Sequence, residues 1–530
     1  MQFLMGLVGI TLVVYLLYLI IGRFPKLKSF FQPDTGYFEL FPKNFFHDLS
    51  QSQDIKRRAG FTLLMVVLYQ LGSFIPIPGL DVSALMEFLG KIHAQAGGGI
   101  YKLVGKFSSG ISDRFNLFSL GVMPYLSACV TLQFLAVLIK PLRRDFFSED
   151  GKGRFKVIRN TLILSIILCA VQAYFYALWM ESPGIFAGAM VVPNPGLLFR
   201  VTMTVSVVAG FCLILWLANL INERGIGHGI AILFLSDLFV EVILATTRMF
   251  LEISAGKYQA LYCVLLFCLL AVLIVFVLFI TTWKREIPVL INDKKVNLPL
   301  RLSWVGRMPV SWAMSFILIP ANIASFVPNQ LFQNFATSLT RGSEFYYVIY
   351  SGLIIFCAFL YVAVIISPEF IARLLKRYHG TLRGEDDTSK IENIFYSAFN
   401  RMTLLIGLLL VFYAILPDII MAVLNVSYGM VSFFQMEVFL IIFGVAYDII
   451  ERIKARLEID KFNCQKVCAI AFDEIEANIK KGFLESQGIR CVIEPLRFTW
   501  GLPIRTAADQ YRLNVAEENV KSAQRLIERE

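Results

Sequence analysis

Charged residues are scarce in this chain. Of its 530 residues only 17% are Asp, Glu, Lys or Arg, whereas 57% are hydrophobic. Soluble domains carry about 25% charged and about 45–50% apolar residues, so the composition excludes an ordinary soluble protein. Long apolar runs instead predict an α-helical protein that crosses a membrane several times, because a helix satisfies its own backbone hydrogen bonds in lipid. We expect spans at 3–21, 59–76, 121–139, 157–180, 200–220, 228–247, 260–283, 309–327, 345–367, 402–420 and 430–449.

The residues that build metal and redox sites are also few or scattered. No two of the four histidines have metal-ligand spacing, and the nine cysteines form no Cys-x-x-Cys pair. The string GIGHGI is glycine-rich but lacks the lysine of a phosphate-binding loop. We therefore expect no enzyme, no metal site and no cofactor. The histidines are His47, His93, His228 and His379.

Lysine and arginine are missing from 181–199 and 421–429, and 328–344 has only Arg341. The alternate loops are basic, and basic loops stay on the cytoplasmic side of a membrane. This pattern predicts an outside N-terminus and a cytoplasmic C-terminal tail. The first run has no basic region before it and no small-residue cleavage site, so we expect a retained helix. The basic loops are 140–156, 284–307, 368–401 and the segment after the first run.

Three parts follow from this pattern. Residues 1–58 hold the first helix and a basic connector, 59–450 form the membrane body, and 451–530 have the charged pattern of a soluble segment. In the tail, KVCAIAF, RCVIEPLRF and YRLNV read as strands, and the two segments that follow the first and third read as helices. We expect a small β-α-β-β-α domain, which has no catalytic cluster and is typical of an interaction or regulatory module.

A polar, glycine-rich stretch, GGGIYKLVGKFSSGISD, precedes the apolar run at 121–139. Gly121 and Pro124 then interrupt the start of that run. Non-helical backbone at membrane depth is tolerated only inside protein or beside water. The stretch therefore indicates either a re-entrant segment beside an aqueous path or an ordinary external loop with a short amphipathic helix.

Several strings in this order resemble the SecY family, the channel-forming subunits of the bacterial protein translocase. They are IPIPGLD, FSLGVMPYLSACVTLQFL, NERGIGHGIAI, GRMPVSWAMSFILIPANIA, SPEFIARLLKRYHGTLRGEDDTSK and AYDIIERIKA, and the resemblance covers about 55–455. It implies an all-α polytopic membrane protein with a ten-helix core in two pseudo-symmetric halves around a pore. The extra N-terminal helix and the small α+β cytoplasmic C-terminal domain are departures from the family.

The resemblance also implies roles for individual residues. An apolar pore ring, which would gate by excluding water, falls on Val122, Leu126, Ile230, Phe234, Ser311 and Ile441. Ser311 is not aliphatic and Phe234 is bulkier than expected, so either the seal differs from the family pattern or the alignment with the family is shifted at these positions. A plug over about 98–112 includes Gly98, Gly99, Ile100, Lys102 and Lys106. Polar residues of a lateral gate correspond to Gln133, Thr161 and Asn322.

The connectors at 284–307 and 368–401 resemble the family's docking sites for the SecA motor and the ribosome. The basic residues expected there are Arg301, Arg373, Lys376, Arg377 and Arg383. The string RGED replaces the family's Arg-Pro-Gly-Glu, which alters the expected partner contact. The same charges also fit an ordinary positive-inside loop. Further partners implied are SecE-like and SecG-like subunits, unfolded preproteins with signal sequences, and membrane lipid.

Acidic residues inside the spans form a separate pattern. Ile230, Phe234, Asp237 and Glu241 recur at helical intervals, and Glu437 lies one turn from Ile441. Acids within membrane helices usually face protein or water. Asp237, Glu241 and Glu437 are therefore predicted to form an acidic outer vestibule that holds Lys102 and Lys106; alternatively, they pair with other helices.

Three functions compete on these grounds. A protein-conducting channel in the bacterial plasma membrane explains the glycine-rich stretch and the ordered strings. An ion-coupled secondary transporter would use the acids as a proton relay, since broken helices also mark transporters. A non-conducting scaffold would signal through its tail. The channel hypothesis accounts for the largest number of features.

Overall fold

In the computed structural model the described residues form two compact units. The N-terminal unit holds the described residues from 52 to 239, and the C-terminal unit holds those from 277 to 529 together with 47–48 and 51. The structure describes residues 47–48, 51–81, 83–84, 115–146, 152–181, 191–239, 277, 284–292, 294–301, 309–310, 312–314, 316–317, 338, 343–365, 367–382, 384–385, 387–424, 436–471, 473–496 and 510–529.

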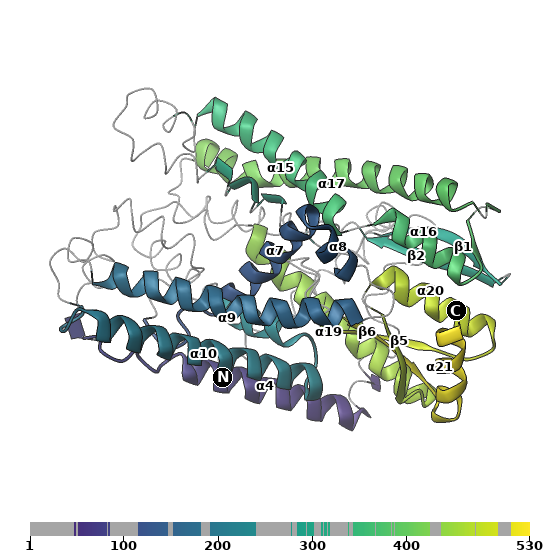
Figure 1. Cartoon of the computed structure of the whole chain (residues 1–530), viewed down its shortest axis with the longest axis horizontal. Helices are drawn as coiled ribbons and strands as arrows, with labels where there is room; N and C mark the ends of the chain where they lie inside the picture. Colours follow the sequence, from purple (N-terminus) through teal and green to yellow (C-terminus); the bar gives the residue numbers. More distant parts are fainter. Residues whose placement is uncertain are drawn as a thin grey trace. The chain divides into compact units, whose positions relative to one another are not determined.

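The N-terminal unit is a bundle of helices. Helix α9 packs against α7, α8 and α10, and α10 also packs against α4 (Figure 1). A shorter apolar helix, Gly229–Phe239, follows α10. The labelled helices are α4 (Gln53–Gly72), α7 (Met123–Leu138), α8 (Lys140–Phe146), α9 (Lys152–Met180) and α10 (Leu197–Arg224).

The connection from α9 to α10 is held by one carboxylate. Glu181 accepts hydrogen bonds from the N–H of Gly196 at 2.8 Å and from Nε of Arg200 at 2.8 Å. Gly196 has φ +144, a conformation that favours glycine, and it directly precedes α10. The hydrogen bond to Arg200 lowers the pKa of the Glu181 carboxyl below its ordinary value.

Four described helices are long and apolar enough to cross a membrane: Phe155–Met180, Leu197–Arg224, Phe345–Arg377 and Thr388–Leu416. Their large apolar side chains divide between the interior and an exposed face. Phe175 of α9 and Leu198 of α10 are examples of exposed residues, and exposed apolar faces of this extent mark contact with lipid or protein. The described helices therefore belong to a multi-pass membrane protein.

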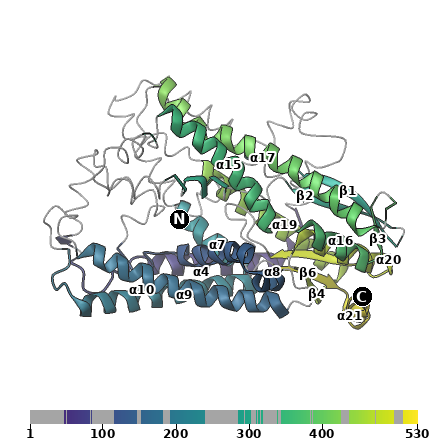
Figure 2. The same cartoon turned by 45° about the horizontal axis from the view of Figure 1, so that its top comes forward.

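In the C-terminal unit, helices α15 (Glu344–Ile365) and α17 (Thr388–Leu424) lie side by side (Figure 2). The last of the long helices is α19 (Met436–Phe462). Two of these helices differ from the predicted spans. Helix α17 begins at Thr388 instead of 402, and α19 continues past 450 to Phe462, so the expected boundary between body and tail falls inside a helix.

The two connectors predicted as basic cytoplasmic loops contain regular secondary structure, which their charge pattern did not indicate. Strands β1 (Lys284–Ile291) and β2 (Lys294–Arg301) form an antiparallel hairpin. Asn292, with φ +45, begins its turn. The second connector forms helix α16 (Pro368–Arg377) and a short strand β3 (Gly380–Thr381), which pairs with β1 in the order β2-β1-β3. The two connectors are therefore parts of one sheet.

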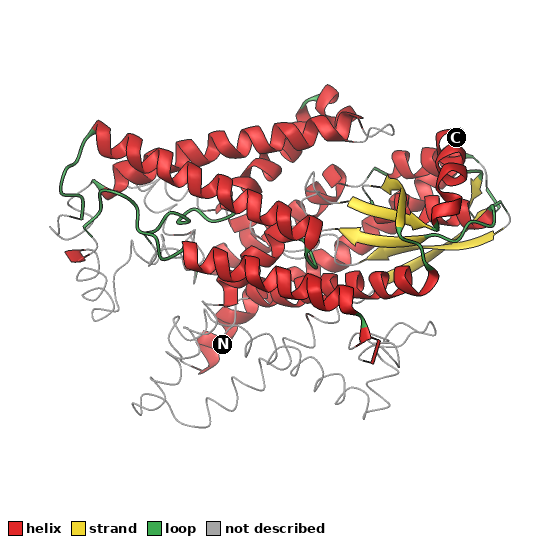
Figure 3. Ribbon diagram, turned by 90° about the horizontal axis from the view of Figure 1, so that it is seen from below, coloured by secondary structure: helices red, strands yellow, loops and turns green. Residues whose placement is uncertain are grey.

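The strand and helix order predicted for the tail agrees with the structure. Strand β4 (Lys466–Ala471), helix α20 (Glu474–Ser486), strands β5 (Val492–Leu496) and β6 (Gln510–Val515), and helix α21 (Val520–Arg529) follow one another. The strands form an antiparallel sheet in the order β4-β6-β5, and Figure 3 shows the strands of both sheets in one group. Asp473 accepts the N–H of Ile475 as N-cap of α20, and Gly488, with φ +79, follows its C-terminal end.

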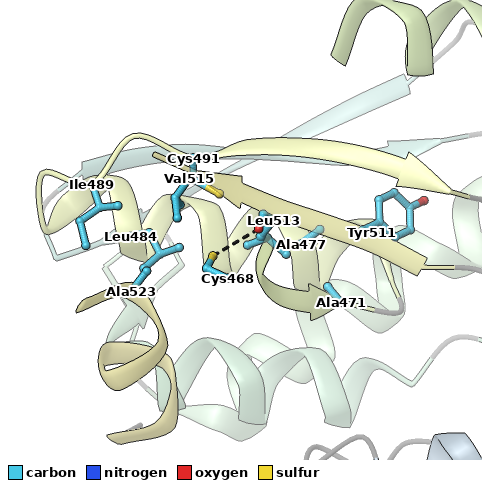
Figure 4. Packing of buried hydrophobic residues seen from close by; sticks show 10 residues of the cluster. All are labelled: Cys468, Ala471, Ala477, Leu484, Ile489, Cys491, Tyr511, Leu513, Val515 and Ala523. Atoms are coloured by element: carbon cyan, nitrogen blue, oxygen red, sulfur yellow. Dashed lines mark hydrogen bonds between the residues drawn. The ribbon is translucent and has the colours of Figure 1, made fainter. Parts of the chain in front are cut away.

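A cluster of small and apolar side chains fills the tail (Figure 4). Leu484 and Ala477 of α20 contribute to it from the helix, and Leu513 and Val515 contribute from the central strand β6. Cys468 also lies in this cluster and donates to the carbonyl of Leu513 at 3.3 Å. Two faces of α20 are buried, because this core lies on one side and the connectors lie on another.

Candidate functional site

Two non-helical segments support each other before α7. Residues 75–77 and 115–117 form a short antiparallel bridge between Pro76 and Asn116. The N–H groups of Ile77 and Leu117 donate across it at 3.3 and 2.9 Å. Since backbone that is not helical must find partners inside the protein at membrane depth, this pairing permits the chain to leave the helical state there. The predicted re-entrant stretch itself, residues 97–113, lies outside the described residues.

Glycine permits the same segment to approach α10 closely. A methyl group at Gly210 would clash with the carbonyl oxygen of Leu117 and lie 2.9 Å from the Leu117 side chain. Gly121, with φ +51, then turns the chain into α7, which begins with a proline in its first turn. The helix breakers noted in the sequence therefore serve to fit a turn against α10 and to begin α7.

The string NERGIGHGI forms a tight turn between α10 and the helix Gly229–Phe239. The hydroxyl of Thr62 accepts the N–H of Ile226 at 2.9 Å, and the side chain of Asn222 accepts the N–H of Gly229 at 2.7 Å. A methyl group at Gly229 would clash with the backbone carbonyl of Ala218. This turn thus fixes the start of a helix that carries two of the predicted pore residues.

Four of the six predicted pore-ring residues have described side chains, and all four are buried in the N-terminal unit. Val122 immediately precedes α7 and Leu126 lies one turn later, while Ile230 and Phe234 are one turn apart on the helix Gly229–Phe239. Their exposed fractions are 1%, 4%, 4% and 3%. These side chains therefore face protein rather than lipid. A pore ring requires this burial, and packing in the core of a helix bundle would also produce it. Ile441 lies on α19 without a described side chain, and Ser311 lies outside the described residues.

Asp237 has partners on another helix of the same unit. The Tyr69 hydroxyl donates to its Oδ2 at 2.6 Å, and Nε2 of Gln70 donates to its Oδ1 at 3.4 Å and to the Ser236 hydroxyl at 3.1 Å. Tyr69 is buried and its ring stacks on Phe118 at 5.3 Å. These contacts favour the alternative in which the acid joins two helices. The vestibule stays a prediction, since Glu241, Lys102 and Lys106 lie outside the described residues and the side chain of Glu437 is not described.

Two predicted gate residues lie on neighbouring helices. Gln133 of α7 and Thr161 of α9 are both buried, and α7 packs against α9. The Thr161 hydroxyl donates to the carbonyl of Val157 at 2.8 Å, within its own helix. The hydroxyl of Thr161 is thus used locally, and its role in a gate stays a prediction. Asn322 lies outside the described residues, as do the predicted plug residues Gly98, Gly99, Ile100, Lys102 and Lys106.

The basic residues of the second connector lie on α16. This helix begins at the N-cap Ser367, whose hydroxyl accepts the N–H of Phe370 at 3.3 Å. One face packs inward through buried apolar residues, and Arg373 and Lys376 are exposed on the other. Arg377 is half-buried in the last turn, Arg301 ends β2, and Arg383 lies outside the described residues.

The tail is attached to α19 by a buried ion pair that the sequence analysis missed. Glu494 of β5 accepts from Arg456 at 2.6 Å, and Arg452 lies 3.5 Å from the same carboxylate oxygen. Burial lowers the pKa of Arg452 to about 10, although the Glu494 charge opposes this shift. No local sequence signal connects residues on a helix with a strand that follows so much later.

The described residues include no group of three or more His, Cys, Asp or Glu side chains that could hold a metal ion. The described part of the site consists of apolar side chains, glycine turns and hydrogen-bonded polar pairs. Such an arrangement can bind and guide a chain or seal a path.

Comparison with known proteins identifies the family. The SecY family matches residues 116–450, which is more than half of the chain. The chain belongs to the SecY family. Relatives within it include the "Protein translocase subunit SecY" of Aquifex aeolicus, which is 30% identical over 77% of this chain and 96% of its own length. The protein of the same name from Escherichia coli K12 is 28% identical over 71% of this chain and 86% of its own length.

A solved structure shares the SecY fold with this chain. It is described as that of a protein-conducting channel, with a TM-score of 0.51 and 15% identity over 77% of this chain and 94% of the other. The family match ends at residue 450, so the tail strands and α21 lie beyond it.

Proposed function

We propose that this chain is the channel-forming subunit of a protein translocase in the bacterial plasma membrane. Unfolded preproteins would cross through it, and hydrophobic segments would leave sideways into lipid. The observation that carries this proposal is the family membership, because the relative named as a translocase subunit is matched over 96% of its length. The turns that support α7 and the helix Gly229–Phe239 add a physical reason, since they hold buried apolar side chains at the expected ring positions.

In this mechanism the chain performs no covalent chemistry. The apolar ring would exclude water and ions when closed, because a narrow hydrophobic constriction dewets. A polypeptide would open it by displacing the plug expected over 98–112. The driving force would come from outside the subunit, from a SecA-type motor or a translating ribosome. A SecE-like subunit would hold the two halves together, and a SecG-like subunit would be a further partner. The tail would lie in the cytoplasm.

The contacts of Asp237 argue against the transporter hypothesis. A proton relay needs a carboxylate that exchanges partners, whereas this carboxylate accepts hydrogen bonds from both Tyr69 and Gln70 of one helix. Two such contacts are typical of a group that fixes helix against helix. The channel therefore remains the function that the site supports best.

Ion conductance of the purified, reconstituted protein tests the proposal with a matched pair of variants. Phe234 is 3% exposed at a predicted ring position, and Phe175 is 65% exposed on α9. Truncating the ring residue should open the closed channel to ions, whereas truncating the lipid-facing residue should not. We expect Phe234→Ala to raise the ion conductance of proteoliposomes at least tenfold and Phe175→Ala to leave it unchanged. Equal conductance in both variants, at equal protein levels, would contradict the ring.

A further inference from the structure

Helix α20 of the tail packs directly on both connectors. It contacts β1 and β2 of the hairpin and α16 of the second connector. The ring of Phe483 lies 5.1 Å from that of Tyr378, and both side chains are buried. A methyl group at Gly482 would lie 3.3 Å from Ile291 and even closer to Val296. The contact is therefore packed as closely as a protein core.

Charged and polar side chains of α20 bind the tip of the hairpin. Glu485 accepts from the Lys294 ammonium at 3.1 Å, and the side chain of Asn292 donates to the Ser486 hydroxyl at 3.2 Å. Lys294 is 44% exposed, so this ion pair is accessible to water and salt. The carboxylate of Glu485 thus occupies the position that an external anion would take beside Lys294.

The tips of the two connectors also form one surface. Strand β3 pairs with the end of β1 through Gly380 and Ile291, next to the turn of the hairpin. Exposed basic side chains also lie on the hairpin and on α16, and of these Arg373 has a weak contact with Glu369 at 3.9 Å. They are Arg285, Lys294, Lys295, Arg373 and Lys376. Exposed basic side chains on both connectors fit a partner that presents many negative charges, such as the phosphate backbone of RNA.

We infer that α20 is a built-in occupant of the connector surface. While it is bound there, it prevents a ribosome from binding to the same surface. The inference rests on the proposed function, in which these connectors dock the partner that drives translocation. Ribosomal RNA phosphate and the Glu485 carboxylate compete for Lys294, and Phe483 covers the apolar part of the same surface. Binding of a ribosome therefore requires the tail to withdraw from the hairpin. Helix α20, which would control ribosome binding in this way, lies beyond residue 450, where the family match ends.

One variant is designed to weaken the contact without altering the core of the tail. Gly482 faces the hairpin, whereas Leu484 and Ala477 of the same helix face the tail's own sheet. Gly482→Val should therefore separate α20 from Val296. Hydrogen exchange of β6 in this variant serves as the control, because an intact tail core keeps that strand protected.

A second variant is designed to lock the contact. Lys294→Cys combined with Glu485→Cys introduces two thiols across the interface, which a short reducible bis-thiosulfonate reagent can join. Each single cysteine variant, treated with the same reagent, controls for modification of the native cysteines. Reduction then releases the lock in the same sample.

Ribosome binding is measured by cosedimentation with the full-length chain in nanodiscs, together with its SecE-like subunit. We expect Gly482→Val to bind ribosomes at least five times more tightly than the unaltered protein. The cross-linked double variant should bind at least ten times more weakly than its reduced form. Equal binding in the locked and released forms, or weaker binding by Gly482→Val, would overturn the inference.

Two further outcomes would also overturn it. If a SecA-type motor showed these shifts while ribosome binding stayed constant, the partner would be a protein and not RNA phosphate. If neither partner responded although a precursor still cross-linked to Val122, the occupant hypothesis would fail while the channel function stood. Loss of the precursor cross-link in every form would instead refute the proposed function.

Discussion

Removing the carboxylate of Glu494 should loosen the tail from the last long helix. This side chain is 1% exposed on β5, and it binds Arg456 at 2.6 Å and Arg452 at 3.5 Å. In Glu494→Ala the guanidinium of Arg452, which is 2% exposed, would keep its charge without this carboxylate. Breaking a buried ion pair by deleting one partner costs about 3–5 kcal/mol.

The lower end of that range applies here. The Arg456 side chain is 20% exposed and regains some hydration, so we expect a loss of about 3 kcal/mol. This corresponds to a roughly hundredfold larger population of the open tail. Hydrogen exchange of the β5 and β6 amides, measured by mass spectrometry on the full-length protein in nanodiscs, reports this opening directly.

An exposed ion pair in the same tail provides the matched control. Lys466 and Glu517 lie 3.3 Å apart, but their side chains are 56% and 81% exposed. Such surface pairs contribute about 0–1 kcal/mol, so Glu517→Ala should change exchange only a few-fold. If Glu494→Ala accelerated exchange no more than Glu517→Ala, burial of the pair would not stabilise the tail as argued.

Three further predictions concern the N-terminal unit. Gly229→Ala should lower the amount of protein in the membrane, measured by immunoblot, because the new methyl clashes with a carbonyl of α10; normal levels would contradict the packing. Tyr69→Phe removes the hydroxyl that donates to Asp237, a hydrogen bond that contributes about 1 kcal/mol in a membrane. This variant should raise the ion leak of the closed channel. An unchanged leak would exclude a sealing role for the hydrogen bond. Because Arg200 lowers the pKa of Glu181, the contact stabilises the protein above the ordinary carboxyl pKa and is lost as the pH falls through the lowered value. The difference in melting temperature between the protein and Glu181→Gln should therefore shrink below about pH 4 and stay constant above pH 6; a constant difference throughout would refute it.

Apolar length was sufficient to predict four of the described helices. The runs at 121–139, 157–180, 200–220 and 345–367 correspond to α7, α9, α10 and α15 within a few residues. Periodicity was also sufficient for the order of strands and helices in the tail. Both signals are local, because each depends on neighbours a few positions away in the chain.

The secondary structure of the connectors was not predicted, although a local signal was present. Residues Ile287, Val289 and Ile291 are buried at every second position of β1, which is the period of a half-buried strand. The early start of α17 had its own signal, since Ile391, Phe395 and Phe399 recur every fourth residue and are buried. The basic charge of the connectors indicates their side of the membrane and carries no information about these periods.

The polar contacts of the site were beyond a single sequence. Tyr69 and Asp237 are 168 positions apart, and Glu494 follows Arg456 by 38. Neither pair has a spacing rule, because only the packing of helices and strands brings them together. Asp237 could be identified from the sequence, because burying a carboxylate in lipid is energetically costly. Its partner Tyr69 could be identified only from the structure.

Photocrosslinking from the predicted ring tests the channel most directly. A photoreactive residue at Val122 or Ile441 is exposed to a stalled, radiolabelled secretory precursor in native membranes. The account predicts a crosslink at both positions that requires the precursor and an energy source. A photoreactive residue at Phe175, which faces outward on α9, should give none with a precursor that lacks a hydrophobic segment. Absence of a crosslink at both ring positions, with the protein intact and its SecE-like partner bound, would contradict the channel.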